Sequence, residues 1–239
     1  MEIIVCVLFA VSLIFIGVRY YTKPLTSLNV PDEAMISNIE AYLDQISPSM
    51  VPDVQSLATQ YNLQSWGCGP TSYALANIIN DKFFNGKAPI MVNYNNHPYE
   101  ISLIFHFADG NANIKNGAIV DHTFIEIYLH NKILFIDPTI GQFGRYPAKI
   151  AYQEFTVGDP NIAETLKNDY GIEDMGVRRL TKKAVDNVPV DQQPYPGFQI
   201  NKADLPYYQT LATNINLIEA GGEPEAWLPW VDFLRGRYH

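Results

Sequence analysis

The hydrophobic and polar positions of this chain change from a helical to a strand-like pattern partway along its length. Apolar residues recur at helical spacing over 32–46, and they predict a helix that ends at a Ser-Pro pair. A shorter helix is predicted over 54–61. A third is predicted from Cys68 through Asp81, with Pro70 in its first turn, where the missing N–H is not needed.

Strand-like stretches follow, separated by clusters of Asn, Gly and Pro. The predicted strands are 90–94, 100–107, 119–129 and 132–137. Beyond them, residues 160–170 predict a helix that Gly171 ends, and 205–220 predict another after the Pro-rich loop at 188–198. The tail 223–234 is apolar and aromatic, so we expect it to pack on the core. Helices followed by a meandering sheet predict an α+β fold.

The N-terminal segment is uncharged from residue 3 to residue 18. A helix of that length spans roughly 24 Å, somewhat less than a hydrocarbon core of about 30 Å. An acid precedes the segment and the first cations follow it, which favours an uncleaved anchor over 1–21 that contacts the membrane through residues 3–21, with the body on the cytoplasmic side. The alternative is a cleaved export signal. Residues 22–31 then form a linker, and 32–239 a single domain.

Composition narrows the chemistry of this domain. The chain has 239 residues and a formal net charge of −9, which argues against nucleic acid as a partner because phosphate binding requires clustered cations. Its two cysteines, Cys6 and Cys68, rule out a disulfide framework and a four-cysteine zinc site. The sequence contains no P-loop, dinucleotide-binding or His-Glu-x-x-His motif, so we expect no metal and no cofactor. Since Cys6 lies in the apolar segment, Cys68 is the free thiol of the body.

Cys68 has the sequence context of a reactive cysteine. Gly67 and Gly69 flank it where a loop enters a predicted helix. The backbone N–H groups and dipole at a helix N-terminus stabilise a thiolate and lower its pKa. Flanking glycines would also allow a substrate carbonyl to approach the sulfur closely. The alternative is that Cys68 is a small buried hydrophobic residue in a glycine-rich turn.

A tight hairpin is predicted around a two-residue loop at 130–131. In this register the apolar residues of the two strands pair on one face, Ile125 with Ile136 and Ile127 with Leu134. His122 becomes a diagonal neighbour of Asp137 on the other face, at about 7–8 Å between backbones, a gap that two such side chains close with a hydrogen bond. A base and the residue that orients it need this arrangement. A three-residue loop would instead place His122 and Asp137 on opposite faces of the sheet. Taken alone, each residue also has an ordinary interpretation: His122 as an exposed histidine and Asp137 as a turn aspartate.

The segments around these residues resemble the papain-like superfamily of Cys-His-Asp enzymes. The stretch WGCGPTSYALANII at 66–79 is similar to the nucleophile helix of double-glycine leader peptidase-like proteins. The phrases His122-x-Phe-x-Glu and Ile-Asp137-Pro-Thr are similar to the His and Asp strands of transglutaminase-like proteins. Arylamine N-acetyltransferases share the Cys, His, Asp order, but their Arg-Gly-Gly before the cysteine is missing. The resemblance covers about residues 60–145.

What the resemblance implies is a papain-like/transglutaminase-like fold, in which a nucleophile helix packs on an antiparallel sheet. Residues 32–239 would then be a catalytic domain. Carried over by position, Cys68 is the nucleophile, His122 is the base and later the acid, and Asp137 orients His122.

The same resemblance suggests an oxyanion donor just before the cysteine, for which Gln64 and Asn62 are the candidates. Trp66, beside the nucleophile, is a candidate wall of the acyl site. We therefore expect a cysteine-dependent acyl-transfer enzyme of thiol protease, glutamine deamidase or transglutaminase type, whose acyl donor is a protein or peptide. The alternative is a membrane-tethered binding or structural protein that keeps an inactive papain-like fold.

Overall fold

The computed structural model describes most of the predicted domain. The proposed anchor, most of the linker and the Pro-rich loop lie outside the described residues. Within the described part of the chain, no helix is both long and apolar enough to cross a bilayer. The described residues are 31–61, 66–92, 98–107, 114–115, 118–119, 121–144, 147–171, 210, 213–218 and 220–239.

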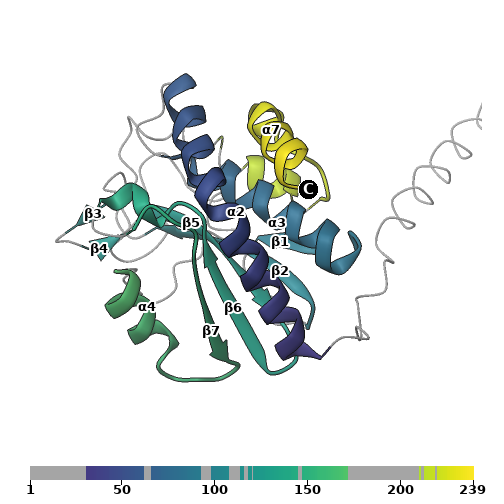
Figure 1. Ribbon diagram of the computed structural model, residues 1–239, viewed down its shortest axis with the longest axis vertical. Helices are drawn as coiled ribbons and strands as arrows, with labels where there is room; N and C mark the ends of the chain where they lie inside the picture. The colour runs from purple at the N-terminus through teal and green to yellow at the C-terminus, as the bar shows by residue number, and fades with distance from the viewer. Residues whose placement is uncertain are drawn as a thin grey trace, which may run out of the picture.

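Helices and strands follow the predicted α+β order (Figure 1). The α-helices are α2 (Asp32–Gln60), α3 (Cys68–Phe84), α4 (Ile162–Tyr170) and α7 (Leu228–Tyr238). The strands are β1 (Ile90–Val92), β2 (Glu100–Phe107), β3 (Ile114–Lys115), β4 (Ala118–Ile119), β5 (Asp121–Tyr128), β6 (Lys132–Asp137) and β7 (Ala151–Thr156). Two 3-10 turns complete the set, η1 (Ile140–Phe143) and η2 (Glu225–Trp227), and residues 213–218 are helical as predicted.

A mixed five-stranded sheet in the order β1-β2-β5-β6-β7 forms the centre of the domain. β1 runs parallel to β2, and the remaining neighbours are antiparallel. The predicted bounds of β2 and β6 are confirmed. The predicted strand over 119–129 is divided, because Ile119 belongs to β4 and the central strand β5 begins at Asp121. The sequence pattern did not predict β7, a short edge strand whose alternation is weakened by polar residues.

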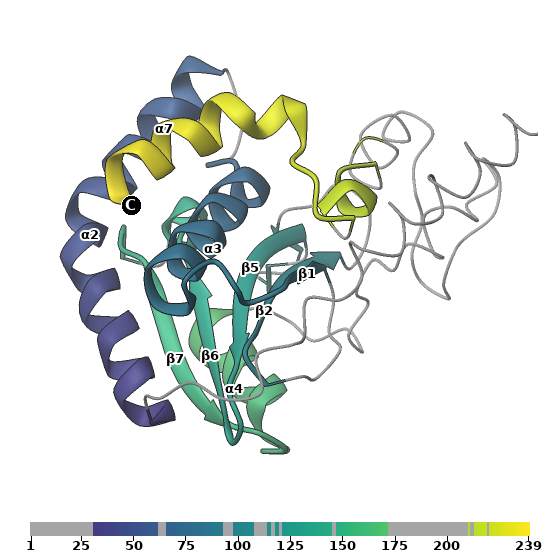
Figure 2. The same ribbon diagram turned by 90° about the vertical axis from the view of Figure 1, so that its right-hand side faces the viewer.

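α2 is one continuous helix, so the predicted break at the Ser-Pro pair and the separate helix over 54–61 are wrong. Pro48 and Pro52 both lie inside it, on its exposed side. The buried stripe continues past them without interruption, through Ile46, Met50 and Val54. Burial of this stripe against the core outweighs the lost backbone hydrogen bonds, and a helix interrupted at proline bends, as α2 does around the domain in Figure 2.

Ser47 connects this bend to the sheet, because its Oγ accepts a hydrogen bond of 2.9 Å from the backbone N–H of Ile150, just before β7. We expect Ser47→Ala to lower the free energy of unfolding by about 1–3 kcal/mol, because it leaves a buried donor without its partner. Ser56→Ala is the matched control, since Ser56 is an exposed serine of the same helix. Urea unfolding of the two variants measures the difference, and equal midpoints would contradict the prediction.

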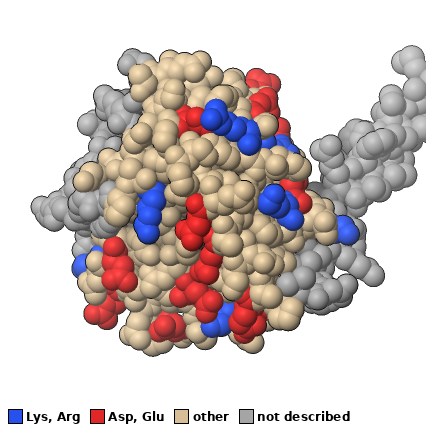
Figure 3. Space-filling model, viewed as in Figure 1, with Lys and Arg blue, Asp and Glu red and all other residues tan. Residues whose placement is uncertain are grey.

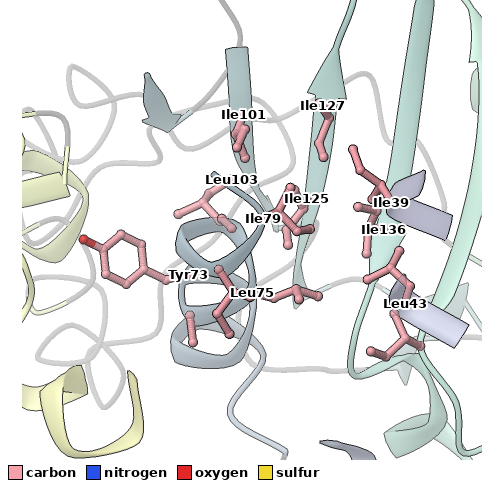
Figure 4. Close-up of a cluster of buried hydrophobic side chains, with 14 of the residues drawn as sticks. Ile39, Leu43, Tyr73, Leu75, Ile79, Ile101, Leu103, Ile125, Ile127 and Ile136 are labelled. Carbon is pink, nitrogen blue, oxygen red and sulfur yellow. The ribbon is translucent and has the colours of Figure 1, made fainter. Parts of the chain in front are cut away.

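The main hydrophobic core lies between one face of the sheet and the helices α2, α3 and α7. In Figure 4, side chains from α3 point at those of the strands, while the side chains of α2 lie beside Ile136 of β6. The central members are Ile39 and Leu43 from α2, Leu75 and Ile79 from α3, and Ile101, Leu103, Ile125, Ile127 and Ile136 from the sheet. The apolar face predicted from the hairpin register is therefore the face on which α3 packs.

The opposite face of the sheet is also buried, which the single predicted apolar face did not anticipate. A second cluster there includes Phe124, Phe135 and Phe155, and Leu166 of α4 packs against it. Strands covered on both faces place polar side chains of the central strands in the interior, and His122 and Asp137 are among them.

The C-terminal tail packs on the core, as predicted. α7 contacts α3 and α2, and its residues Trp230, Val231 and Leu234 are almost fully buried. Tyr238 donates a hydrogen bond to Asp53, and the Tyr42 hydroxyl donates one to the Tyr238 carbonyl. These contacts fix the far end of the tail to α2, so its near end is held beside the start of α3 (Figure 2).

Acidic side chains gather on the outer surface of α2 and β7, and a band of acidic residues crosses the middle of the face in Figure 3. Burial raises the pKa of Glu40, and the charges of Glu154 and Asp44 raise it further. Lys132 forms an ion pair with Glu154 at the edge of this surface.

Candidate active site

The turn that leads into Cys68 is shaped by tryptophans of the C-terminal tail. Gly67, which precedes α3, has a φ of 57°, and a Cβ atom on it would lie 2.8 Å from the Trp230 ring. A Cβ atom on Gly69 would lie 3.1 Å from the Trp227 ring. Tryptophan rings, rather than open space for a substrate carbonyl, lie where a side chain at either position would point. Close packing therefore explains why glycine stands at both positions.

Two side-chain hydrogen bonds hold the tail against this turn. Trp230 donates from Nε1 to Thr71 Oγ1 at 3.0 Å, and the Thr71 hydroxyl donates to the Trp66 carbonyl at 3.2 Å. Cys68 is the first residue of α3, a partly exposed residue at the position where helix N–H groups favour a negative charge.

The hairpin has the predicted register, which places His122 and Asp137 on neighbouring strands. The Leu129 N–H donates to the Lys132 carbonyl at 2.9 Å across a two-residue loop. The paired residues of β5 and β6 are Ile125 with Ile136, Glu126 with Phe135, Ile127 with Leu134 and Tyr128 with Ile133. His122 is the second residue of β5 and Asp137 the last of β6, so both lie at the same end of the sheet.

Asp137 and His122 form a buried, directly bonded pair. His122 Nε2 lies 2.6 Å from Asp137 Oδ2, with both side chains inaccessible to solvent. The other carboxylate oxygen accepts the Thr139 backbone N–H at 2.9 Å and faces the Thr139 hydroxyl at 3.4 Å. Because the carboxylate accepts the Nε2 proton, the second ring nitrogen, Nδ1, is the one left to exchange a proton.

Cys68 also forms a hydrogen bond with the His122 side chain. Burial raises the pKa of the Cys68 thiol, but the hydrogen bond and charge of His122, helped by Thr123, outweigh it, so that the net shift is downward. Burial lowers the pKa of His122, and the Asp137 carboxylate and the Cys68 thiolate reverse this and raise it to about 10. The two shifts have opposite signs, and together they favour a thiolate–imidazolium pair at neutral pH.

α3 is fixed to β5 right beside the pair. The Ser72 hydroxyl, one turn after Cys68, donates a hydrogen bond of 3.1 Å to the carbonyl of Thr123, the residue after His122. Both Ser72 and Thr123 are buried. The start of α3 and the segment that carries His122 are thus joined directly by this hydrogen bond.

η1 adds residues that the sequence argument missed. Phe143 lies edge-on to the His122 ring, with centroids 5.0 Å apart and an angle of 83°. The Gln142 amide contacts three parts of the site: Trp66, Thr139 and His122. A polar residue four or five positions after Asp-Pro carries no signal of its own, because its placement depends on the 3-10 turn that the sequence pattern did not predict.

Among the remaining candidates, Trp66 lies at the site, partly buried, with its ring against Gly141. Gln64 and Asn62, the candidate oxyanion donors, lie outside the described residues. His130 is remote from the site in its contacts, since its ring nitrogen faces the Tyr99 hydroxyl and Asp32.

The described residues contain no group of three or more His, Cys, Asp or Glu side chains arranged to hold a metal ion. No family model, curated protein or solved structure matches this chain. The chemical assignment therefore depends on the geometry of the site itself. That geometry consists of a cysteine at a helix N-terminus, a histidine hydrogen-bonded to it, and a buried carboxylate bonded to the histidine.

Proposed function

We propose that this protein is a cysteine-dependent acyl-transfer enzyme with a papain-like catalytic arrangement of Cys68, His122 and Asp137. The observation that carries the proposal is the buried His122–Asp137 pair, joined at 2.6 Å, with a hydrogen bond between the Cys68 and His122 side chains. A buried imidazole between a carboxylate and a thiol has the base, the orienting group and the nucleophile that acyl transfer needs.

The reaction would proceed in two steps. The Cys68 proton passes to His122 Nδ1, and the thiolate sulfur attacks the carbonyl carbon of an acyl donor. The imidazolium gives its proton to the leaving amine as the C–N bond breaks, which leaves a thioester on Cys68. His122 then removes a proton from water or from an acceptor amine, which attacks the thioester and releases the acyl group.

The oxyanion of each tetrahedral intermediate needs donors close to the sulfur. The backbone N–H of Cys68, in the first turn of α3, forms no hydrogen bond within the helix and is therefore suited to this role. Gln64 or Asn62 remains our proposal for the second donor, with Trp66 as a wall of the acyl site.

A protein or peptide amide is the proposed acyl donor. Water as acceptor gives a thiol protease or a glutamine deamidase, and an amine gives a transglutaminase. An anchor over 1–21 would hold the catalytic domain at a membrane, with the domain on the cytoplasmic side.

Trapping the thioester tests the proposal. The full chain is incubated with a mixture of peptides, quenched in acid and digested, and the peptide that contains Cys68 is examined by mass spectrometry. We expect an added acyl mass on Cys68, removable by hydroxylamine and absent from Cys68→Ala, and that mass would name the donor. If the chain is folded and Cys68 carries no acyl group with any donor, the proposal fails and a binding protein with an inactive fold replaces it.

A further inference from the structure

Gln142 makes three contacts that converge on the candidate site from separate segments. Its Oε1 accepts the backbone N–H of Trp66, two residues before Cys68, at 3.1 Å. Its Nε2 lies 3.3 Å from Thr139 Oγ1, in the turn that holds Asp137. The same Nε2 lies 3.5 Å from His122 Nδ1.

The orientation of this amide is fixed by its surroundings. A backbone N–H can only donate, so the atom opposite Trp66 N must be the amide oxygen. The NH₂ group is then directed at the Thr139 hydroxyl, which can accept, and it lies 3.5 Å from Nδ1, which can accept from it while the His122 ring is neutral. Reversing the amide would place an N–H against the Trp66 N–H.

Nothing else among the described contacts joins these three segments through one side chain. Ser72 fixes the body of α3 to β5, but the turn before Cys68 is held from the other direction, by Gln142 on one side and Thr71 on the other. The ring of Trp66 packs on Gly141, where a Cβ atom would lie 3.0 Å from it, so η1 contacts the nucleophile turn through side chain and backbone together.

We propose that Gln142 is a positioning residue that keeps the nucleophile turn and the His122 ring in contact; this inference rests on the proposed function. The hydrogen bond and charge of His122 favour the thiolate only while Sγ and Nδ1 stay close. Without the Gln142 amide, the turn at 66–68 loses its attachment to η1, and the contact that favours the thiolate weakens.

The test is the pH dependence of Cys68 alkylation by iodoacetamide, measured on the full chain and read by mass spectrometry. Gln142→Leu keeps the size of the side chain and removes both polar ends. We expect its alkylation at neutral pH to be about tenfold slower, with the midpoint of the pH profile raised by about one pKa unit, since tenfold in an equilibrium corresponds to one unit. Gln142→Ala, with a smaller side chain, should show the same loss and keeps the test valid if leucine is not accommodated.

Gln142→Glu supplies the rescue. Its carboxylate can still accept the Trp66 N–H, so we expect its alkylation rate to return to within about threefold of the wild type. That residual difference corresponds to the lower end of the net free energy that one hydrogen bond contributes. Gln45→Leu, an exposed glutamine in the middle of α2, is the matched control and should leave the profile unchanged.

Two results would overturn the inference: a wild-type profile in folded Gln142→Leu or Gln142→Ala, or a Gln142→Glu variant as slow as Gln142→Leu. If His122→Ala is alkylated at the wild-type rate, the proposed function fails as well as this inference. If the rate of Cys68 alkylation depends on His122 but not on Gln142, only this inference fails.

Discussion

Replacing His122 by alanine is expected to slow acylation of Cys68 at neutral pH by about 10²–10⁴-fold, the usual contribution of a positioned base. His122 supplies both the hydrogen bond and the charge that lower the pKa of the thiol. Once they are removed, burial is the largest remaining influence, and burial favours the neutral thiol. The midpoint of the pH profile should therefore move from below the ordinary thiol value of 9.0 to above it.

In the wild type the same reasoning sets both limits of the profile. Reactivity should rise as pH increases through the lowered pKa of Cys68, and the imidazolium should keep its proton until pH approaches its own pKa of about 10. Stopped-flow measurement with a peptide thioester donor follows the acylation step directly. His130→Ala is the matched control, since His130 is a largely exposed histidine bound to Tyr99 and Asp32. Equal rates and midpoints for His122→Ala and His130→Ala would exclude His122 as the base.

The second large effect concerns the turn before the nucleophile. Gly67→Ala should lower the free energy of unfolding by about 2–5 kcal/mol, which combines about 1–2 kcal/mol for alanine in the left-handed region with about 1–3 kcal/mol for overpacking against Trp230. The clash follows from the 2.8 Å between a Cβ at Gly67 and the Trp230 ring.

Gly158→Ala separates these two causes. Gly158 also has a positive φ, 81°, but a Cβ atom there meets nothing within 4 Å. Its substitution should therefore show only the backbone contribution. Thermal and urea unfolding of the two variants measure the difference, and equal destabilisation would mean that the turn can move away from Trp230. Adding Trp230→Leu to Gly67→Ala should recover part of the loss if the ring is the obstacle.

The hairpin was predictable because its alternation of apolar and polar residues admits one register. Ile125 and Ile127 match Ile136 and Leu134 only across a two-residue loop, and a shift by one would put the two pairs on opposite faces of the sheet. That register places His122 near Asp137, so the local sequence was sufficient to predict their proximity. The residues from Gly67 to Pro70 were sufficient to predict that Cys68 begins a helix. They could not predict its contact with His122, because that contact depends on how α3 packs across the sheet.

The continuity of α2 and the existence of β7 were not predictable from local rules. Pro48 and Pro52 signal a helix end wherever tertiary packing does not oppose it, and here the stripe from Ile46 to Val54 is buried in the core. The strand β7 is a partner of β6, and its pairing, rather than its own composition, makes it a strand.

The same limit applies to the residues around Cys68. The two glycines were correctly singled out, but the rings that occupy their free space come from Trp227 and Trp230, about 160 positions away. Gln142 was missed for a related reason, because its role requires the turn after Asp137 and the turn before Cys68 to be adjacent. Contacts between distant segments cannot be predicted from the local sequence of either segment.

The attachment of Trp230 to Thr71 has a consequence for how this protein acquires reactivity. The bond joins residues 159 positions apart, so it forms only when the C-terminal helix has docked on a chain whose other parts are already in place. A folding intermediate without that helix would have an unsupported nucleophile turn and a cysteine of ordinary acidity. Rapid alkylation of Cys68 in mildly acidic solution would then be a kinetic marker of the last docking step, separable from the earlier formation of the sheet.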